Sequence, residues 1–356
     1  MTTEKLQNVF SSLRNVWQDA CSVIVNSRTA AYSNTLSTSL DIGNAYVKAV
    51  SLKKDDHGAV TVMGFGCEKI GDDVKTTIKN VLSKMPTNKK DVALSVAGRG
   101  VILRYITLPI MSYEETVNSM AFELEKYIPF SPEDINFDFS ILKKNKNTGK
   151  MLVLIAAAKK ELISQRLKLC EEVGCRPRCI DVGPLAVANF CSEIEQVREG
   201  VCAVVELGSS ATSLDIIEDG LLVLSRDIFI GGNDFTKRIG ENLGKNFEEA
   251  EQLKVSGAAE EIASSMEVVL SNLIGELKVS FDFYETQSNR LIDKILLSGG
   301  SARLKVVVDA FRQSLGQEVF LIEHDPQKLK IDPAVDAEQF RKQFNYLVVA
   351  IGTALR

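Results

Sequence analysis

This sequence contains very little histidine and none of the most familiar nucleotide-binding motifs. Its 356 residues include only two histidines, His57 and His324, which are too few to build a Ser/His/Asp or Cys/His arrangement. Neither a GxxxxGK(S/T) phosphate loop nor a GxGxxG fingerprint occurs. These absences argue against a triad hydrolase, a P-loop ATPase and a dinucleotide-dependent enzyme.

Long apolar runs, paired cysteines and an excess of basic charge are also missing. No stretch approaches the ~18 apolar residues of a membrane-spanning helix, and Met1–Lys5 does not begin a signal peptide, so we expect a cytoplasmic protein. Seven cysteines form no CxxC pair, and we interpret the cluster Cys170, Cys175 and Cys179 as small apolar side chains rather than a metal site. A net charge of −5 argues against bulk binding to nucleic-acid phosphates.

The N-terminal 38 residues form a segment of their own. Residues 5–24 place apolar side chains at three- and four-residue steps, which predicts an amphipathic helix. A polar stretch, Ser27–Ser39, follows and is interpreted as a linker. The helix either binds a partner or a membrane, or packs on the body of the protein, which we expect to begin near Leu40.

The body contains the same pattern twice. Ser39–Ile42, Val47–Leu52 and Val60–Gly64 are strand-like runs joined by a Gly-containing turn and a second turn. Val201–Glu206, Thr212–Ile217 and Leu221–Ser225 repeat this order. Such a duplication predicts two similar α/β lobes rather than one large sheet.

Each copy offers a turn that suits a phosphate. Glycine with small polar neighbours lets backbone N–H groups approach an anion, and two such hairpins facing each other would hold a polyphosphate from both sides. A carboxylate opens each turn, Asp41 and Glu206, and could hold Mg²⁺ through waters. Turns of this kind also end ordinary strands, but the duplication favours binding. The candidate residues are Asp41, Gly43, Asn44, Ala45 and Lys48 in the first hairpin, and Glu206, Gly208, Ser209 and Ser210 in the second.

Two further glycine pairs follow strands in the second half. Gly231-Gly232 and Ser298-Gly299-Gly300 each stand between a strand-like run and a helical pattern, where backbone amides at a helix N-terminus could contact a nucleotide. Between them, Glu251 and Lys254 have the i,i+3 spacing of a surface ion pair on a helix.

These motifs resemble those of actin-like ATPases, in the same order, and most closely the PilM family of type IV pilus assembly proteins. The similarity covers residues 40–356, and the segment Tyr127–Phe130 (YIPF) favours PilM over FtsA or actin. It is carried by Leu40–Val50, Leu108–Phe130, Ile180–Ala188, Ser280–Tyr284 and Val349–Arg356.

The resemblance implies an actin-like (ribonuclease H-like) α/β fold of two lobes, with an FtsA-type subdomain inserted in the first. It places ATP and Mg²⁺ between the lobes, Glu251 and Lys254 by the ribose and adenine, and Ser298, Gly299 and Gly300 on the nucleoside side. It implies a scaffold or adaptor recruited to the inner membrane by the cytoplasmic N-terminal peptide of a PilN-like protein. The expected segments are 1–38, a first-lobe core 39–99, an insert 100–175, a return 176–199, a second lobe 200–340 with an outer part 236–292, and a C-terminal helix 341–356 on the first lobe.

Two departures from the family pattern bear on catalysis. The second hairpin opens with Glu206 where Asp is usual, and Gly183-Pro184 supply no polar side chain to orient an attacking water. We therefore expect a slow ATPase at most. The alternatives are a small-molecule kinase of the same fold with Asp181 as base, an FtsA-like filament or division protein, and a secretion-system relative.

Overall fold

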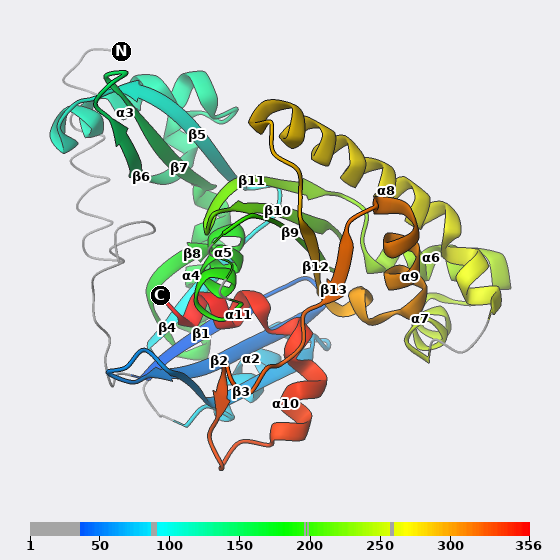
Figure 1. Cartoon of the computed structure of the whole chain (residues 1–356). Coiled ribbons are helices and arrows are strands. Elements are labelled where there is room, and N and C mark those ends of the chain that lie inside the picture. Colours follow the sequence, from blue (N-terminus) through cyan, green and yellow to red (C-terminus); the bar gives the residue numbers. More distant parts are fainter. Residues whose placement is uncertain (1–35, 87–90, 196, 198, 257–259) are drawn as a thin grey trace.

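Two lobes, each built around one β-sheet, face each other, and a third, smaller sheet projects from the first lobe (Figure 1). The structure is a computed structural model that describes residues 36–86, 91–195, 197, 199–256 and 260–356. The helix predicted at 5–24 lies outside these residues. Within them, no helix combines the length and the apolar character needed to cross a membrane.

The first lobe is built on a six-stranded sheet with strand order β14-β3-β2-β1-β4-β8. β1 begins at Leu36 rather than near Leu40, so the predicted linker is too long at its C-terminal end. The polar side chains there are buried but bonded: Thr38 Oγ1 lies 2.7 Å from Ser51 Oγ, and Ser39 Oγ donates to the Ala350 carbonyl at 2.7 Å. The strands are β1 (Leu36–Ile42), β2 (Tyr46–Lys54), β3 (Val60–Lys69), β4 (Asp91–Val96), β8 (Arg176–Val182) and β14 (Lys330–Ile331).

The second lobe repeats this arrangement with the order β11-β10-β9-β12-β13. In both sheets an antiparallel meander of three strands continues into parallel strands, which confirms the predicted duplication. β14 pairs with β3 of the first sheet, so the chain returns to the first lobe before residue 341, the boundary expected from the sequence. The strands are β9 (Val201–Leu207), β10 (Thr212–Glu218), β11 (Leu221–Ile228), β12 (Lys294–Ser298) and β13 (Glu318–Leu321).

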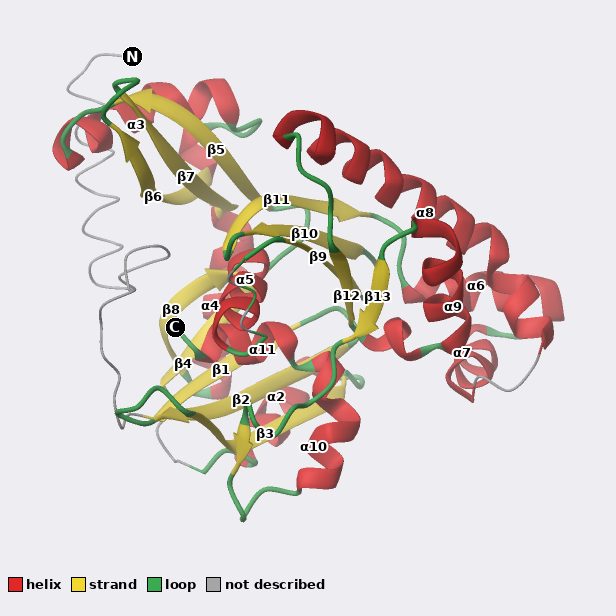
Figure 2. Ribbon diagram, viewed as in Figure 1, coloured by secondary structure: helices red, strands yellow, loops and turns green. Residues whose placement is uncertain are grey.

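Helices cover both sheets and fill the space between them (Figure 2). Where α5 and α11 cross, a Cβ on Gly352 would lie 1.8 Å from the Ala186 carbonyl oxygen, so only glycine allows this approach. The first-lobe helices are α2 (Val74–Ser83), α4 (Lys160–Val173), α5 (Gly183–Glu193), α10 (Ala337–Gln343), η3 (Phe344–Tyr346) and α11 (Val348–Ala354). The second lobe carries α6 (Gly232–Leu243), α7 (Phe247–Ser256), α8 (Glu260–Ser288), η2 (Gly300–Arg303) and α9 (Lys305–Leu315).

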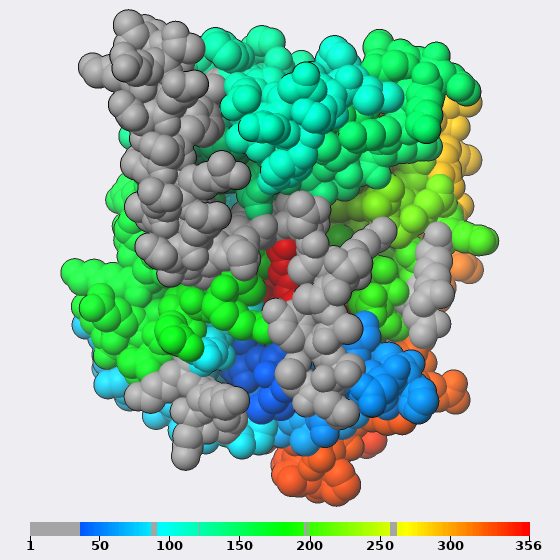
Figure 3. All heavy atoms as spheres, turned by 90° about the vertical axis from the view of Figure 1, so that its left-hand side faces the viewer, coloured from blue at the N-terminus to red at the C-terminus, as the bar shows by residue number. Residues whose placement is uncertain are grey.

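The insert has its own three-stranded sheet, in the order β5-β7-β6, and its own apolar core. Its elements are β5 (Val101–Pro109), α3 (Tyr113–Tyr127), η1 (Pro132–Asp134), β6 (Ile135–Asn145) and β7 (Lys150–Lys159). β6 was not predicted from the sequence. The insert expected at 100–175 included α4, whereas Ile163 and Cys170 of α4 belong to the first-lobe core. Figure 3 shows the insert at one end of the molecule and the C-terminal residues, in red, between it and the first lobe.

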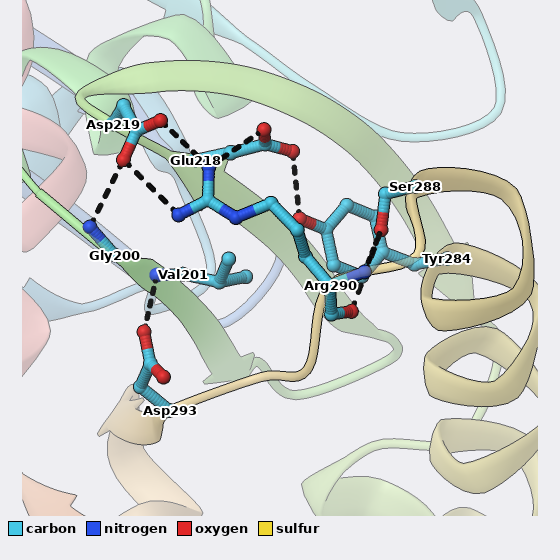
Figure 4. Close-up of polar contacts among 8 residues, drawn as sticks. All are labelled: Gly200, Val201, Glu218, Asp219, Tyr284, Ser288, Arg290 and Asp293. Carbon is cyan, nitrogen blue, oxygen red and sulfur yellow. Dashed lines mark hydrogen bonds and ion pairs between the residues drawn. The ribbon is translucent and has the colours of Figure 1, made fainter.

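A polar network holds the chain where it leaves α8 (Figure 4). This network lies at one end of the second sheet, and the hairpin turn of Gly208 lies at the other end. Arg290 Nη1 lies 2.8 Å from Glu218 Oε1 and 2.6 Å from Asp219 Oδ2. Tyr284 of α8 donates to Glu218 Oε2 at 2.7 Å, and Asp293 accepts from the Val201 amide at 2.6 Å. The β10–β11 turn, the end of α8 and the start of β12 are therefore held together.

Candidate functional site

A cleft of about 780 Å³ lies between the two lobes. Every residue that the sequence analysis proposed for the nucleotide site lines it, except Gly231 and Ser298. The duplicated hairpins reach this cleft from opposite lobes. Each hairpin follows the strand that comes first in the chain within its sheet, β1 in the first lobe and β9 in the second. Distant parts of the chain are thereby brought together: Asn44 and Ser210, which are 166 residues apart in sequence, are hydrogen-bonded.

The first hairpin is a tight turn whose carboxylate is already bonded. The Gly43 amide donates to the Tyr46 carbonyl at 3.0 Å. Lys48 Nζ lies 2.8 Å from Asp41 Oδ2, and Ser95 Oγ donates to Asp41 Oδ1 at 2.7 Å. Burial alone would lower the pKa of Lys48, but the carboxylates of Asp41 and Glu206 outweigh it and raise that pKa. Lys48 therefore stays a cation beside the place proposed for the phosphates.

The second hairpin has the same turn and is supported from behind by α6. The Gly208 amide donates to the Ala211 carbonyl at 3.0 Å, and a Cβ on Gly208 would lie 2.8 Å from that oxygen. The amides of Gly232 and Asn233 donate to the carbonyls of Gly208 and Ser209 at 2.8 and 2.7 Å. These two amides at the start of α6 are thus used to hold the hairpin, and we do not expect them to contact a nucleotide directly.

The tips of the two hairpins meet across the cleft. The side-chain amide of Asn44 donates to the Ser210 hydroxyl. This contact joins the two lobes at the tips of the hairpins. A polyphosphate would lie against both turns beside this contact.

Three carboxyl groups of the second sheet face the cleft, and two of them have strongly raised pKa values. Burial raises the pKa of Glu206 to about 7, with Lys48 opposing and Asp41 adding to the effect. Burial also raises the pKa of Asp215 to about 8, and Asp215 Oδ1 has no hydrogen-bond partner among the described residues. Asp227 accepts from Ser213 Oγ at 2.7 Å. Asp215 and Asp227 were not identified from the sequence, although both lie on the same face of the neighbouring strands β10 and β11.

The carboxylates fit Mg²⁺ only with the help of water and phosphate. No group of three or more His, Cys, Asp or Glu side chains within the described ranges is arranged to hold a metal ion. Mg²⁺ usually keeps several waters and needs only one or two carboxylates when phosphates supply further oxygens. Asp41 and Glu206 can play that part, and a cation would also relieve the repulsion between them.

Glu251 and Lys254 are more than a surface ion pair. Lys254 is only 5% exposed, and its Nζ donates to Gly232 O at 2.9 Å, to Thr236 Oγ1 at 2.7 Å and to Glu251 Oε2 at 2.6 Å. Burial lowers the pKa of Lys254, against the attraction of Glu251. The interpretation of this pair as exposed is therefore wrong, because Lys254 ties α7 to the first turn of α6 at the wall of the cleft.

The last glycine pair lies beside an aromatic pair. Gly299 has a φ of +89°, and a Cβ there would lie 2.4 Å from the Leu207 carbonyl oxygen, so glycine is required. Ser298 does not line the cleft; its hydroxyl donates to the Asn345 carbonyl at 2.9 Å. Gly300 makes room for the ring of Tyr346, which packs against Tyr46 of the first hairpin with 5.2 Å between ring centroids. Neither tyrosine was identified from the sequence.

Asp181, the only candidate for the base of a kinase, is not in the cleft. It is 0% exposed, and its Oδ1 lies 2.8 Å from Arg356 Nη1. Its other oxygen has no partner among the residues described here. A carboxylate paired with a cation in the core cannot accept a proton from a substrate, so the kinase alternative loses its catalytic residue.

A model of the family "Type IV pilus assembly protein PilM" matches residues 39–356. The chain belongs to the PilM family. A solved structure titled "PilM-PilN type IV pilus biogenesis complex" is 24% identical, with a TM-score of 0.80 over 91% of this chain and 98% of that one. The fold and the family predicted from the sequence are thus confirmed.

More distant similarities agree on the fold. The ethanolamine utilization protein EutJ from Carboxydothermus hydrogenoformans is 16% identical, with a TM-score of 0.54 over 97% of both chains. A ROK family glucokinase from Streptomyces griseus is 10% identical, with a TM-score of 0.52 over 90% of this chain and 98% of that one. The cell division protein FtsA of Bacillus subtilis is 30% identical over 95 residues, which are 27% of this PilM-family chain and 21% of FtsA.

Proposed function

We propose that this PilM-family chain is an ATP-binding adaptor of a type IV pilus assembly machine. The observation that carries this proposal is the pair of glycine hairpins that face each other across the interlobe cleft in a member of this family. ATP would lie with its phosphates against the turns of Gly43–Ala45 and Gly208–Ser210. Its ribose and base would lie toward Glu251, Lys254 and Gly300. Mg²⁺ would be held through water by Asp41 and Glu206.

The residues of the cleft supply binding rather than fast chemistry. Backbone amides and Lys48 neutralise phosphate charge, and Mg²⁺ would contribute further positive charge when it is bound. The start of α5, Gly183-Pro184, lines the cleft but carries no polar side chain to orient a water. Asp215 and Glu206 are the remaining candidates for accepting a proton. We therefore propose slow hydrolysis at most.

The partner we propose is the cytoplasmic N-terminal tail of a PilN-like inner-membrane protein, which would bring this chain to the cytoplasmic face of the membrane. Support comes from the family and from the similarity to the structure named as a PilM–PilN complex. An extended peptide would bind through backbone hydrogen bonds and a few apolar anchors. Within the insert, Leu108 and Ile128 are buried in the core, whereas Ile110, Tyr113 and Tyr127 are exposed. The exposed three are the better candidates for peptide contacts.

Nucleotide binding is tested by calorimetry with ATP and Mg²⁺. Valine at Gly208 would push a side chain into the turn, because even a Cβ there meets the Ala211 carbonyl oxygen at 2.8 Å, so Gly208→Val should abolish binding. The matched control is Gly275→Val on α8, where a Cβ meets nothing within 4 Å. Asp41→Asn should remove the magnesium dependence. Unchanged affinity in both cleft variants would refute the assignment.

The partner is tested separately with the N-terminal peptide of the inner-membrane protein encoded beside this chain. Binding should be measurable by calorimetry and should weaken in Ile110→Asp and Tyr127→Asp. Val279→Asp on α8, which also changes an exposed apolar residue, should bind as wild type does. Absence of binding up to high micromolar peptide, with ATP and Mg²⁺ present, would argue against the adaptor function.

A further inference from the structure

Arg166 is a cleft residue that no motif indicates. It stands on α4, lines the cleft, and its Nη2 donates to the carbonyl of Ile42 at 3.0 Å. Ile42 directly precedes Gly43, so the guanidinium is attached to the backbone of the first hairpin. It was absent from the residues that the sequence and the family resemblance suggested.

The order of the first sheet places Arg166 on a particular side of that hairpin. β1 lies between β2 and β4. Tyr46 of β2 packs against Tyr346, whose ring lies against Gly300 of the proposed nucleoside side, so the proposed ribose and base side lies toward β2. Arg166 stands on α4, which packs against β8 on the side of β1 where β4 lies. A nucleotide with its base by Glu251 and its phosphates on the hairpins therefore directs its last phosphate toward β4 and Arg166.

The guanidinium is also incompletely bonded. Arg166 Nε is buried and has no hydrogen-bond partner among the described residues. Burial lowers the pKa of Arg166, while the nearby carboxylate of Asp41 opposes this effect. The Nη2 bond to Ile42 is the single hydrogen bond of this guanidinium to the described residues, so N–H groups on Nη1 and Nη2 remain for an anionic oxygen, which an arginine suits because it stays charged.

We propose that Arg166 contacts the terminal phosphate of a bound nucleoside triphosphate and so makes the cleft prefer triphosphate over diphosphate. This inference rests on the proposed nucleotide binding. An arginine can donate two parallel hydrogen bonds to a phosphate, and in other phosphate-transferring proteins an arginine supplied by the same chain stabilises this group. In a purely structural role, Arg166 would only satisfy the Ile42 carbonyl, and its loss would not distinguish between nucleotides.

The experiment compares the affinities of AMPPNP and ADP, each with Mg²⁺, for the full chain and for three variants. Arg166→Gln removes the charge, and Arg166→Lys keeps it without the second donor. Lys168→Gln removes the same charge from an exposed position on the same helix. We expect Arg166→Gln to bind AMPPNP about 10- to 100-fold more weakly and ADP within about 2-fold of wild type, with Arg166→Lys between and Lys168→Gln unchanged.

The outcomes separate the inference from the proposed function. Failure of the wild-type chain to bind either nucleotide would refute the proposed function, and this inference with it. The inference alone would be refuted if the wild-type chain binds both nucleotides and Arg166→Gln loses the same affinity for AMPPNP as for ADP. It would also be refuted if Arg166→Gln loses no affinity for either nucleotide. If Arg166→Gln does not fold, Arg166→Lys carries the test, since a selective loss of AMPPNP affinity remains expected there.

Discussion

Replacing Arg356 by alanine should destabilise the protein through a single buried carboxylate. Asp181 is 0% exposed, and Arg356 Nη1 lies 2.8 Å from its Oδ1. Removing one partner of a buried ion pair costs about 3–5 kcal/mol, because the other charge remains buried. With an unfolding entropy of about 2.1 cal/mol/K per residue, each kcal/mol corresponds to roughly 1.3 °C for a chain of 356 residues. Calorimetric unfolding of Arg356→Ala should therefore show a midpoint lower by about 4–7 °C at neutral pH.

The sign of the pH dependence provides a second readout. Burial raises the pKa of Asp181 in the folded protein, and Arg356 opposes this effect. Without Arg356 the pKa of Asp181 in the folded protein rises further. As pH falls, Asp181 therefore binds a proton in the folded state before it does so in the unfolded state. The variant consequently recovers stability on acidification. Asp138 acts in the same direction, since burial raises its pKa to about 6 and Arg356 again opposes the effect. The deficit should be larger at about pH 8 than at about pH 5.

A double variant separates the ion pair from simple loss of packing. Asp181→Asn combined with Arg356→Ala removes both charges, and Asn can still accept the hydrogen bond that the Val182 amide gives to Asp181 Oδ1 at 2.8 Å. It should recover most of the lost stability. A deficit that is the same at both pH values, or no recovery in the double variant, would refute the reasoning.

Three further predictions follow from the cleft and the N-terminus. Because burial raises the pKa of Glu206 to about 7, magnesium-dependent nucleotide affinity should rise between about pH 6 and about pH 8 as this carboxyl loses its proton, and Glu206→Gln should flatten the profile. Steady-state phosphate release should stay below about 1 s⁻¹; several turnovers per second would show that Glu206 and Gly183-Pro184 do not limit hydrolysis. Deleting residues 1–35 should reduce association with partners or membranes and leave the thermal midpoint nearly unchanged, whereas a sharp fall in the midpoint alone would show that this segment packs on the body.

The sequence predicted the fold well because the fold is duplicated. Two runs of strand, glycine turn and strand identify the two lobes, and apolar alternation identifies most of their strands. The prediction failed where polar residues are buried in pairs. Thr38 and Ser51 satisfy each other inside the first sheet, so composition suggested a linker where β1 begins.

The hairpins of the candidate site were predictable for a different reason. At Gly208 a Cβ would lie 2.8 Å from the Ala211 carbonyl oxygen, so the tight turn needs glycine, and that need is visible in a short motif. Arg166 reaches the same cleft through tertiary structure alone, because it stands on a helix that follows the insert, and no local pattern reveals it. Asp215 stands on the strand that directly follows the second hairpin, and only its place on the same face as Ser213, which pairs with Glu206 and Asp227, marks it.

The insert is held by both lobes, which no motif indicates either. The Tyr105 hydroxyl of β5 donates to the Leu222 carbonyl of β11, 117 residues away. Arg99, just before β5, lies 4.1 Å from the ring centroid of Phe229, just after β11. At its other end the insert continues directly from β7 into α4, the helix that carries Arg166. A movement of the second lobe must therefore either break these two contacts or carry the insert with it.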